Sequence, residues 1–125
     1  LALVEGCPDL SGYYMDQIER EHKTSFVSHE TGQIAKLSFK RISRHAGFSV
    51  VDINLETGRH HQIRVQFAHR GFPVVGDVKY GATKTFSGKN IALYAYSLTL
   101  SHPISKEILT FESMPGNDWD RFLFN

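Results

Sequence analysis

The sequence has a single cysteine, no long apolar run and few prolines, and each shortage excludes a class of protein. Cys7 cannot form an internal disulfide, which agrees with a reducing, cytoplasmic setting. No apolar run of about 18 residues, signal peptide or lipidation motif is present, so no membrane span is expected. Four prolines and ten glycines mark turns rather than disorder. The 125 residues therefore fit a single domain, small for an enzyme.

The net charge of +1 hides an uneven distribution. Residues 36–70 hold seven Lys or Arg against two acids, and four of the seven histidines lie there. The basic residues are Lys36, Lys40, Arg41, Arg44, Arg59, Arg64 and Arg70. Such an asymmetry is typical of a surface that faces a polyanion. A cluster of charge is also typical of a solvated face, so the distribution alone leaves both interpretations open.

Two segments, residues 34–42 and Phe48–Leu55, alternate apolar and polar residues, which predicts half-buried strands. The apolar residues that share a face are Ala35, Leu37 and Phe39 in the first segment and Val51, Ile53 and Leu55 in the second. His45–Gly47 is predicted as the turn that joins the two strands.

Weaker signals extend the sheet on both sides. Leu1–Gly6 is predicted as a short strand and Glu30–Gly32 as a hairpin turn, whereas Tyr13–Lys23 is polar and only weakly patterned. Ile91–Leu100 is predicted as a strand that pairs with Ile108–Ser113. The expected fold class is α+β, a mixed, mostly antiparallel sheet with one short helix. An unpaired edge of that sheet could drive self-association.

The single helix is predicted within the stretch 55–82. Apolar residues about one helical turn apart favour a helix over His60–Arg70. Thr57 or a neighbour is expected to cap the first amides. Gly71 then serves as a left-handed stop, and Pro73 prevents continuation.

The start of this helix is unusually cationic. Its first turn contains Arg59, His60, His61, Gln62 and Arg64, although the positive end of a helix dipole normally attracts acids. A bound phosphate or carboxylate would turn that unfavourable placement into a binding site. A solvated polar face is the alternative, and the residues by themselves do not separate the two.

An uninterrupted series of unusual residues surrounds this helix. They are Thr57-Gly58-Arg59, His61-Gln62-Ile63-Arg64-Val65, Gly71-Phe72-Pro73-Val74, Gly76-Asp77 and Lys79-Tyr80-Gly81. The series resembles the C-terminal signature of the RluA/RluD-type pseudouridine synthase family. Ile91–Ser101 also resembles the closing hairpin of that family, with Leu93-Tyr94-Ala95 where Leu-His-Ala is usual, and Leu1–Gly6 resembles the end of its motif Tyr-x-Ala-x-Val-x-Gly.

The resemblance implies an isomerase that converts uridine to pseudouridine in ribosomal or transfer RNA, so RNA is the expected partner. The family uses the carboxylate of an Asp in an Arg-Leu-Asp motif on an extruded nucleotide, and it needs no cofactor. Arg64 is implied as the partner of that Asp, because an adjacent guanidinium lowers the carboxyl pKa and orients it. No metal is expected, since the sequence has no His-Glu-x-x-His motif or paired cysteines.

Further residues are implied as RNA-binding or pocket residues by their place in the motifs. They are Arg59, His61, Gln62, Lys79, Tyr80 and Tyr94. Arg59 and His61 are expected either to support the turn or to contact RNA phosphate. Gln62 is expected to satisfy backbone groups of the same turn.

The nucleophile of the family is not found in this sequence. Asp9, Asp16, Asp52 and Asp77 do not lie in an Arg-Leu-Asp setting, and Asp77 is interpreted as a turn former. Residues 1–125 are therefore expected to be the C-terminal portion of a catalytic domain, without the N-terminal part that holds the catalytic Asp, and to be inactive alone. The alternative is a non-catalytic RNA-binding or structural module derived from the same fold.

Overall fold

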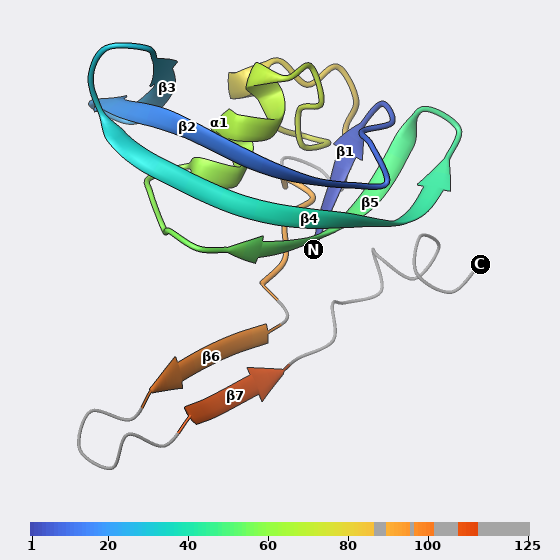
Figure 1. Cartoon of the computed structure of the whole chain (residues 1–125). Coiled ribbons are helices and arrows are strands. Elements are labelled where there is room, and N and C mark those ends of the chain that lie inside the picture. The colour runs from blue at the N-terminus through green and yellow to red at the C-terminus, as the bar shows by residue number, and fades with distance from the viewer. Residues whose placement is uncertain (87–89, 96, 102–107, 113–125) are drawn as a thin grey trace.

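The structure is a computed structural model that describes residues 1–86, 90–95, 97–101 and 108–112. Its elements in chain order are β1 (Ala2–Glu5), β2 (Ser11–Glu21), β3 (Thr24–Ser28), β4 (Gln33–His45), β5 (Phe48–Leu55), α1 (Gln62–His69), the 3₁₀ helix η1 (Val78–Tyr80), β6 (Ser97–Ser101) and β7 (Ile108–Glu112) (Figure 1).

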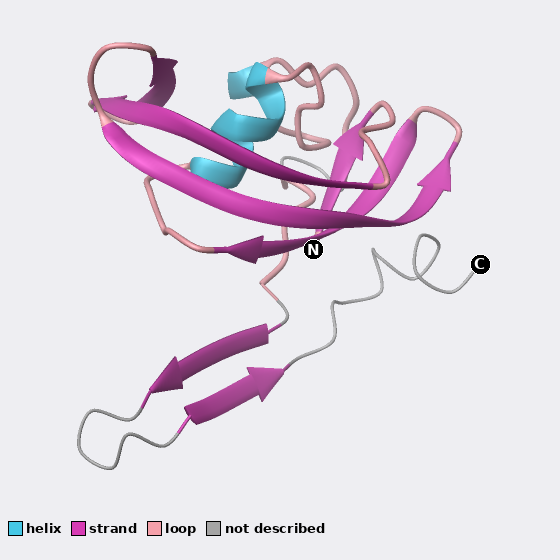
Figure 2. Cartoon of the chain, in the orientation of Figure 1, coloured by secondary structure: helices cyan, strands magenta, loops and turns pink. Residues whose placement is uncertain are grey.

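The first five strands form one curved sheet in the order β1-β5-β4-β2-β3, and α1 lies against one face of it (Figures 1 and 2). The strands β6 and β7 form a separate two-stranded ribbon. Every pairing between the described strands is antiparallel. This confirms the predicted α+β class, a mostly antiparallel sheet with one short helix. In the described part of the chain, no helix is both long and apolar enough to cross a membrane.

The core lies between α1 and the face of β4 that the alternation predicts to be buried. Ala35, Leu37 and Phe39 are at most 5% exposed. The ring of Phe67, from α1, lies with its centroid 5.3 Å from that of Phe39 and 5.0 Å from that of Tyr14 on β2. Full burial of one such ring contributes about 1.5–3 kcal/mol to folding, so these aromatic contacts hold the helix on the sheet.

The prediction for β5 was right about its limits and partly wrong about its faces. The turn at His45–Gly47 joins β4 to β5 as expected, and His45 pairs with Phe48. Val50 and Val51 are both fully buried, however, whereas Leu55 is 47% exposed. The reason is that β1 pairs only with Phe48–Val51, so the first half of β5 is central and the second half lacks that neighbour.

In the first third of the chain, a segment without a predicted element is a strand, and one prediction was wrong. β2 occupies most of Tyr13–Lys23 and pairs with β4 through its first part and with β3 through its last. Glu30–Gly32 is not a hairpin turn, because the strands that it joins, β3 and β4, lie on opposite sides of β2. Gly32 crosses the end of β2 there with φ +105°, and a Cβ on it would lie 2.6 Å from the carbonyl oxygen of Ile18.

The helix ends as predicted but starts later. Gly71 has φ +87°, and Phe72 donates its N–H to the Phe67 carbonyl at 2.9 Å, which closes the C-terminus. At the other end, α1 begins at Gln62 rather than His60, because His61 is itself left-handed with φ 54°. No side chain caps the first amides from that position, so the expected Thr57 cap is not formed.

The strand predicted over Ile91–Leu100 is also shorter than expected. Only Ser97–Ser101 forms β6, which pairs with β7 as predicted. Residues 91–95 instead run along the outer edge of β1: Leu3 donates its N–H to the Ala92 carbonyl at 2.9 Å, and Tyr94 donates to the Leu1 carbonyl at 2.8 Å. This segment covers a sheet edge rather than continuing a hairpin.

Candidate active site

The turn that leads into α1 is built from side-chain to backbone hydrogen bonds. The Thr57 hydroxyl accepts the Lys36 N–H at 2.9 Å and donates to Gln62 Oε1 at 2.7 Å. Gln62 Oε1 also accepts the Arg59 N–H at 3.0 Å, and Gln62 Nε2 donates to the Lys36 carbonyl at 3.1 Å. Gln62 is only 3% exposed. As expected, it satisfies backbone groups of this turn, which fixes the start of the helix against β4.

Arg64, one turn into α1, is clamped by Asp77. Its Nε donates to Oδ2 at 2.9 Å and its Nη2 donates to Oδ1 at 2.8 Å, a bidentate pair. The Asp77 carboxylate is fully buried and the Arg64 side chain is 18% exposed. The hydrogen bonds that Arg64 donates to Asp77 raise the pKa of Arg64 above its usual value. Asp77 also shapes the turn, since its carbonyl accepts the N–H groups of Tyr80 and Ala82.

Tyr80 joins three elements around this ion pair. Its hydroxyl accepts the Ser25 N–H from β3 at 3.0 Å and lies 2.7 Å from Nδ1 of His61. The Arg64 guanidinium carbon lies 5.0 Å from the centroid of the Tyr80 ring, within the range of a cation–π contact. The phenol therefore ties β3 and the start of α1 to η1, the element that follows Asp77.

His61 is neutral near pH 7. Burial, followed by the positive charges of Arg64, His60 and Lys79, lowers its pKa from 6.5 to about 4, against a smaller opposing effect of Asp77. The His60 ring stacks on it at a centroid distance of 3.8 Å. A neutral ring can accept the Tyr80 phenol proton at Nδ1, which leaves the phenol oxygen to accept the Ser25 N–H.

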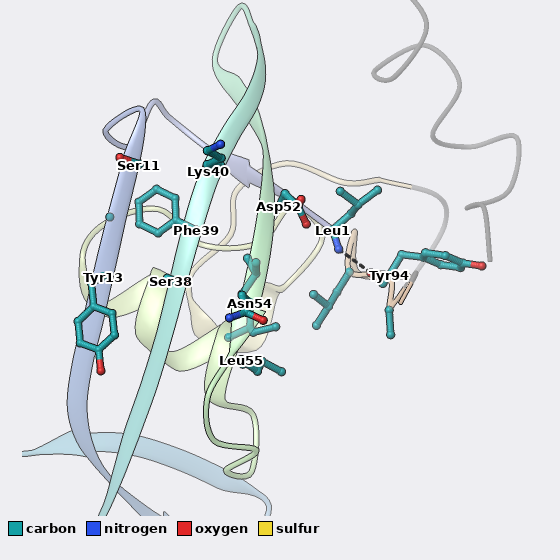
Figure 3. Close-up of a pocket in the computed structure, with 15 residues that line it drawn as sticks. Leu1, Ser11, Tyr13, Ser38, Phe39, Lys40, Asp52, Asn54, Leu55 and Tyr94 are labelled. Carbon is teal, nitrogen blue, oxygen red and sulfur yellow. Dashed lines mark hydrogen bonds between the residues drawn. The ribbon is translucent and has the colours of Figure 1, made fainter. Parts of the chain in front are cut away.

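The remaining predicted site residues lie in different places. Arg59 donates Nε to the Ile34 carbonyl at 2.9 Å, and Lys79 donates Nζ to the Lys23 carbonyl. Tyr94 lines a groove of about 1100 Å³ over β2, β4 and β5, together with Tyr13, Ser38, Phe39, Lys40 and Asp52 (Figure 3). Arg64, Asp77 and Tyr80 are not among the residues of this groove. The structure thus brings His61, Arg64 and Tyr80 together, and it places Tyr94 in the lining of this groove.

Sequence reasoning missed two partners in this site. Asp77 was interpreted only as a turn former, although its place in the Gly76-Asp77 motif was a signal that could have marked it. Ser25 carried no signal, because nothing in a short polar strand shows which distant hydroxyl its N–H will meet.

Within the described residues, no three His, Cys, Asp or Glu side chains are grouped as metal ligands would be.

Comparison with known proteins places this chain in one family. The family model described as RNA pseudouridylate synthase matches residues 1–69. The uncharacterized RNA pseudouridine synthase YlyB of Bacillus subtilis (strain 168) is 36% identical over 107 residues, which are 86% of this chain and 35% of that protein. The chain therefore belongs to the RNA pseudouridylate synthase family, as its motifs suggested.

Other relatives agree in sequence and in structure. The ribosomal large subunit pseudouridine synthase D of Nitrosomonas europaea is 33% identical, over 94% of this chain and 37% of that protein. The structure of human RNA pseudouridylate synthase domain containing 1 superposes with a TM-score of 0.72 at 25% identity, covering 91% of this chain and 52% of the human one. The chain thus spans about a third of the length of these two curated relatives.

Proposed function

We propose that this chain supplies the arginine side of the active site of an RNA pseudouridine synthase, which isomerises uridine in ribosomal or transfer RNA in the cytoplasm. The observation that carries the proposal is the clamp on Arg64. Asp77 holds Nε and Nη2, and no described residue bonds Nη1. Arg64 can therefore present donors to a second carboxylate while its own geometry is fixed.

The proposed chemistry breaks the bond between the ribose and N1 of uridine, turns the base and rejoins it through C5. A carboxylate acts as nucleophile or base on an extruded nucleotide. That carboxylate must stay ionised in a partly dry pocket. A guanidinium next to it lowers its pKa and orients it, which is the role that we give to Arg64. This chemistry needs no cofactor.

The nucleophilic carboxylate is proposed to come from outside these 125 residues. The sequence has no Arg-Leu-Asp, Asp77 already binds Arg64, and Asp16 binds Arg70 at 2.7 Å. The chain then corresponds to the C-terminal portion of a catalytic domain and is inactive alone. The second candidate, a non-catalytic RNA-binding or structural module, is favoured only by the same missing motif.

Reconstitution distinguishes the two candidates. The chain is co-expressed with the part of Bacillus subtilis YlyB that it does not cover, and tritium release from RNA containing 5-tritiated uridine is measured. We expect product from the pair, none from the chain alone, and a loss of at least about 100-fold with Arg64→Lys, since lysine cannot make the bidentate contact. Arg44→Lys, at an exposed position, is the matched control.

Three outcomes would contradict this assignment. Product formed by the purified 125-residue chain alone would refute the missing nucleophile. A reconstituted pair in which Arg64→Lys is fully active would remove Arg64 from the site. Failure of every complementing partner to give product, although the complexes form, would favour the non-catalytic module.

A further inference from the structure

A second group of cations lies beside the Arg64 clamp and comes from three different elements. Arg20 lies near the end of β2, Lys79 lies in η1, and His60 precedes α1. Hydrogen bonds hold the three elements together. Ser25, the cross-strand neighbour of Arg20, has its hydroxyl 2.7 Å from Nδ1 of His60, and Lys79 Nζ donates to the Lys23 carbonyl in the β2–β3 turn.

The charges in this group are not neutralised by neighbouring acids. Among the described residues, the ion pairs are Arg64–Asp77 and Arg70–Asp16, and neither Arg20 nor Lys79 takes part in one. Within the described residues, the Arg20 side chain donates only its Nε, to the His22 carbonyl at 2.8 Å. Both Arg20 and Lys79 are exposed, so their charged ends are accessible to a ligand.

The nearest acids in the sequence lie on the other face of the sheet. Successive residues of a strand point to opposite faces, so Glu19 and Glu21 point away from the face on which Arg20 and Ser25 lie. Glu19 is also engaged, because it accepts a hydrogen bond from the Thr31 hydroxyl. The alternation of β2 therefore separates the two signs of charge.

The effect of this separation is visible at His60. Partial burial and then the charges of Arg20, Lys79 and Arg64 lower the pKa of His60 below its usual value. All the charged groups that shift the pKa of His60 are therefore cations. In the described part of the chain, Nε2 of His60 has no hydrogen-bond partner, so this neutral ring offers one further polar atom to a ligand.

The opposite face of the sheet is the competing basic surface. Lys36 and Lys40, on β4, point to the side away from α1, but Lys40 lies directly opposite Asp52 on β5. A phosphate that approached Lys40 would meet that carboxylate as well. Arg20 lies directly opposite Ser25 rather than an acid, so the side of the sheet that bears Arg20 is the more favourable site for an anion.

We infer that Arg20 and Lys79, with His60 between them, bind backbone phosphates of RNA next to the nucleotide that reacts at Arg64. This inference rests on the proposed function for its choice of RNA. Paired cations on neighbouring elements suit a phosphodiester backbone, because phosphate contacts position a nucleic acid without reading its sequence. His60 stacks on His61, which lies within hydrogen-bond distance of the Tyr80 hydroxyl beside Arg64, so the two rings connect this site to the clamp.

The test measures binding of a fluorescently labelled, single-stranded, uridine-containing RNA to the 125-residue chain by anisotropy over a series of salt concentrations. We expect Arg20→Gln with Lys79→Gln to lower the affinity about tenfold and to reduce the slope of log K against log salt by about 1.4, since each lost contact to single-stranded RNA accounts for about 0.7. Lys36→Gln with Lys40→Gln removes the same charge from the other face and should leave both quantities nearly unchanged.

A charge-conserving pair, Arg20→Lys with Lys79→Arg, should bind like the wild type and guards against misfolding as the cause. If the variants on the two faces lost equal affinity for RNA, the effect would be one of net charge and the inference would be overturned. Unchanged binding by the Arg20→Gln, Lys79→Gln variant, or no RNA binding by the wild type, would overturn it as well. Failure of the proposed function is distinguishable: RNA binding would then depend on Arg20 and Lys79 while no reconstituted pair forms pseudouridine.

Discussion

At the scale of single residues, Arg64 and Asp77 act as a unit. The Asp77 carboxylate is fully buried, and Arg64 is its ion-pair partner among the described residues, so removal of Arg64 would leave an uncompensated buried charge. Arg64 is partly exposed and can keep its charge in water. This asymmetry suits a guanidinium that is held by Asp77 at Nε and Nη2 and can donate hydrogen bonds from Nη1 to a reacting group.

His61 gives this site a dependence on pH. Its pKa is about 4 in the folded chain and near 6.5 when unfolded, so between these values the unfolded chain binds a proton that the folded chain does not. The free energy of unfolding should therefore fall as the pH drops from 6.5 to 4. Urea unfolding at several pH values should show a smaller fall for His61→Asn, because asparagine does not titrate and tolerates the left-handed backbone.

At pH 7 the same variant should be less stable by about 1 kcal/mol, the contribution of one hydrogen bond, because the contact of His61 with the Tyr80 hydroxyl is lost. Parallel pH curves for wild type and His61→Asn would show that His61 does not titrate as described.

At the scale of elements, two polar contacts supplement the aromatic packing that holds α1 on the sheet. Arg70 donates to both oxygens of Asp16 on β2, at 2.7 and 3.1 Å, and its guanidinium lies 3.9 Å from the Tyr14 ring centroid. Burial acts to raise the pKa of Asp16, but the hydrogen bonds from Arg70 and Gln66 outweigh it and bring the pKa below the usual value. The C-terminal end of α1 is thus fixed by one ion pair and its first turn by another, Arg64–Asp77.

The crossing from β3 to β4 depends on Gly32. We expect Gly32→Ala to destabilise the chain by about 2–4 kcal/mol, because alanine has to adopt φ +105° and its Cβ meets the Ile18 carbonyl oxygen at 2.6 Å. Gly81→Ala is the matched control, with φ +103° and nothing within 4 Å of the added atom, and should cost only about 1–2 kcal/mol. If Gly32→Ala and Gly81→Ala lowered the free energy of unfolding equally, in thermal and urea unfolding, the result would show that the Cβ at residue 32 is not crowded by the Ile18 carbonyl.

At the scale of the whole molecule, the two edges of the sheet differ. The β1 edge is covered by backbone hydrogen bonds, including Glu5 N–H to the Pro73 carbonyl and Leu3 N–H to the Ala92 carbonyl, both 2.9 Å. The β3 edge is covered at Ser25, whose N–H points outward to Tyr80. By the alternation of an antiparallel strand, the Val27 N–H points outward too, and no described residue accepts it.

If two copies of the chain associate by pairing sheet edges, the contact should therefore form at the β3 edge. We expect the sedimentation coefficient to rise with concentration for the wild type and to stay constant for Val27→Pro, since proline removes the outward N–H and is tolerated at a sheet edge. An unchanged melting temperature would confirm that the variant is folded. Dimers that persist in Val27→Pro would exclude this edge as the interface.

The sequence by itself determined the elements whose signals are local. Alternation predicted the buried face of β4, the glycine and proline signals predicted the end of α1, and the motif around Arg64 predicted the family, because each depends on residues a few positions apart. Gln62 was also predicted to bond the turn in which it lies.

Only the tertiary structure decided which distant groups meet. Contacts between elements, which no local period specifies, produce the Arg64–Asp77 clamp and the burial of Val50. They also produce the hydrogen bond from the Ser25 N–H to the Tyr80 hydroxyl. Most of the weakly patterned segment Tyr13–Lys23 is a strand because β4 and β3 both pair with it, and such long-range pairing can override weak local preference. His61 has a left-handed backbone with φ 54°, a conformation that histidine adopts more often than most residues, but no local period in the sequence marks the position.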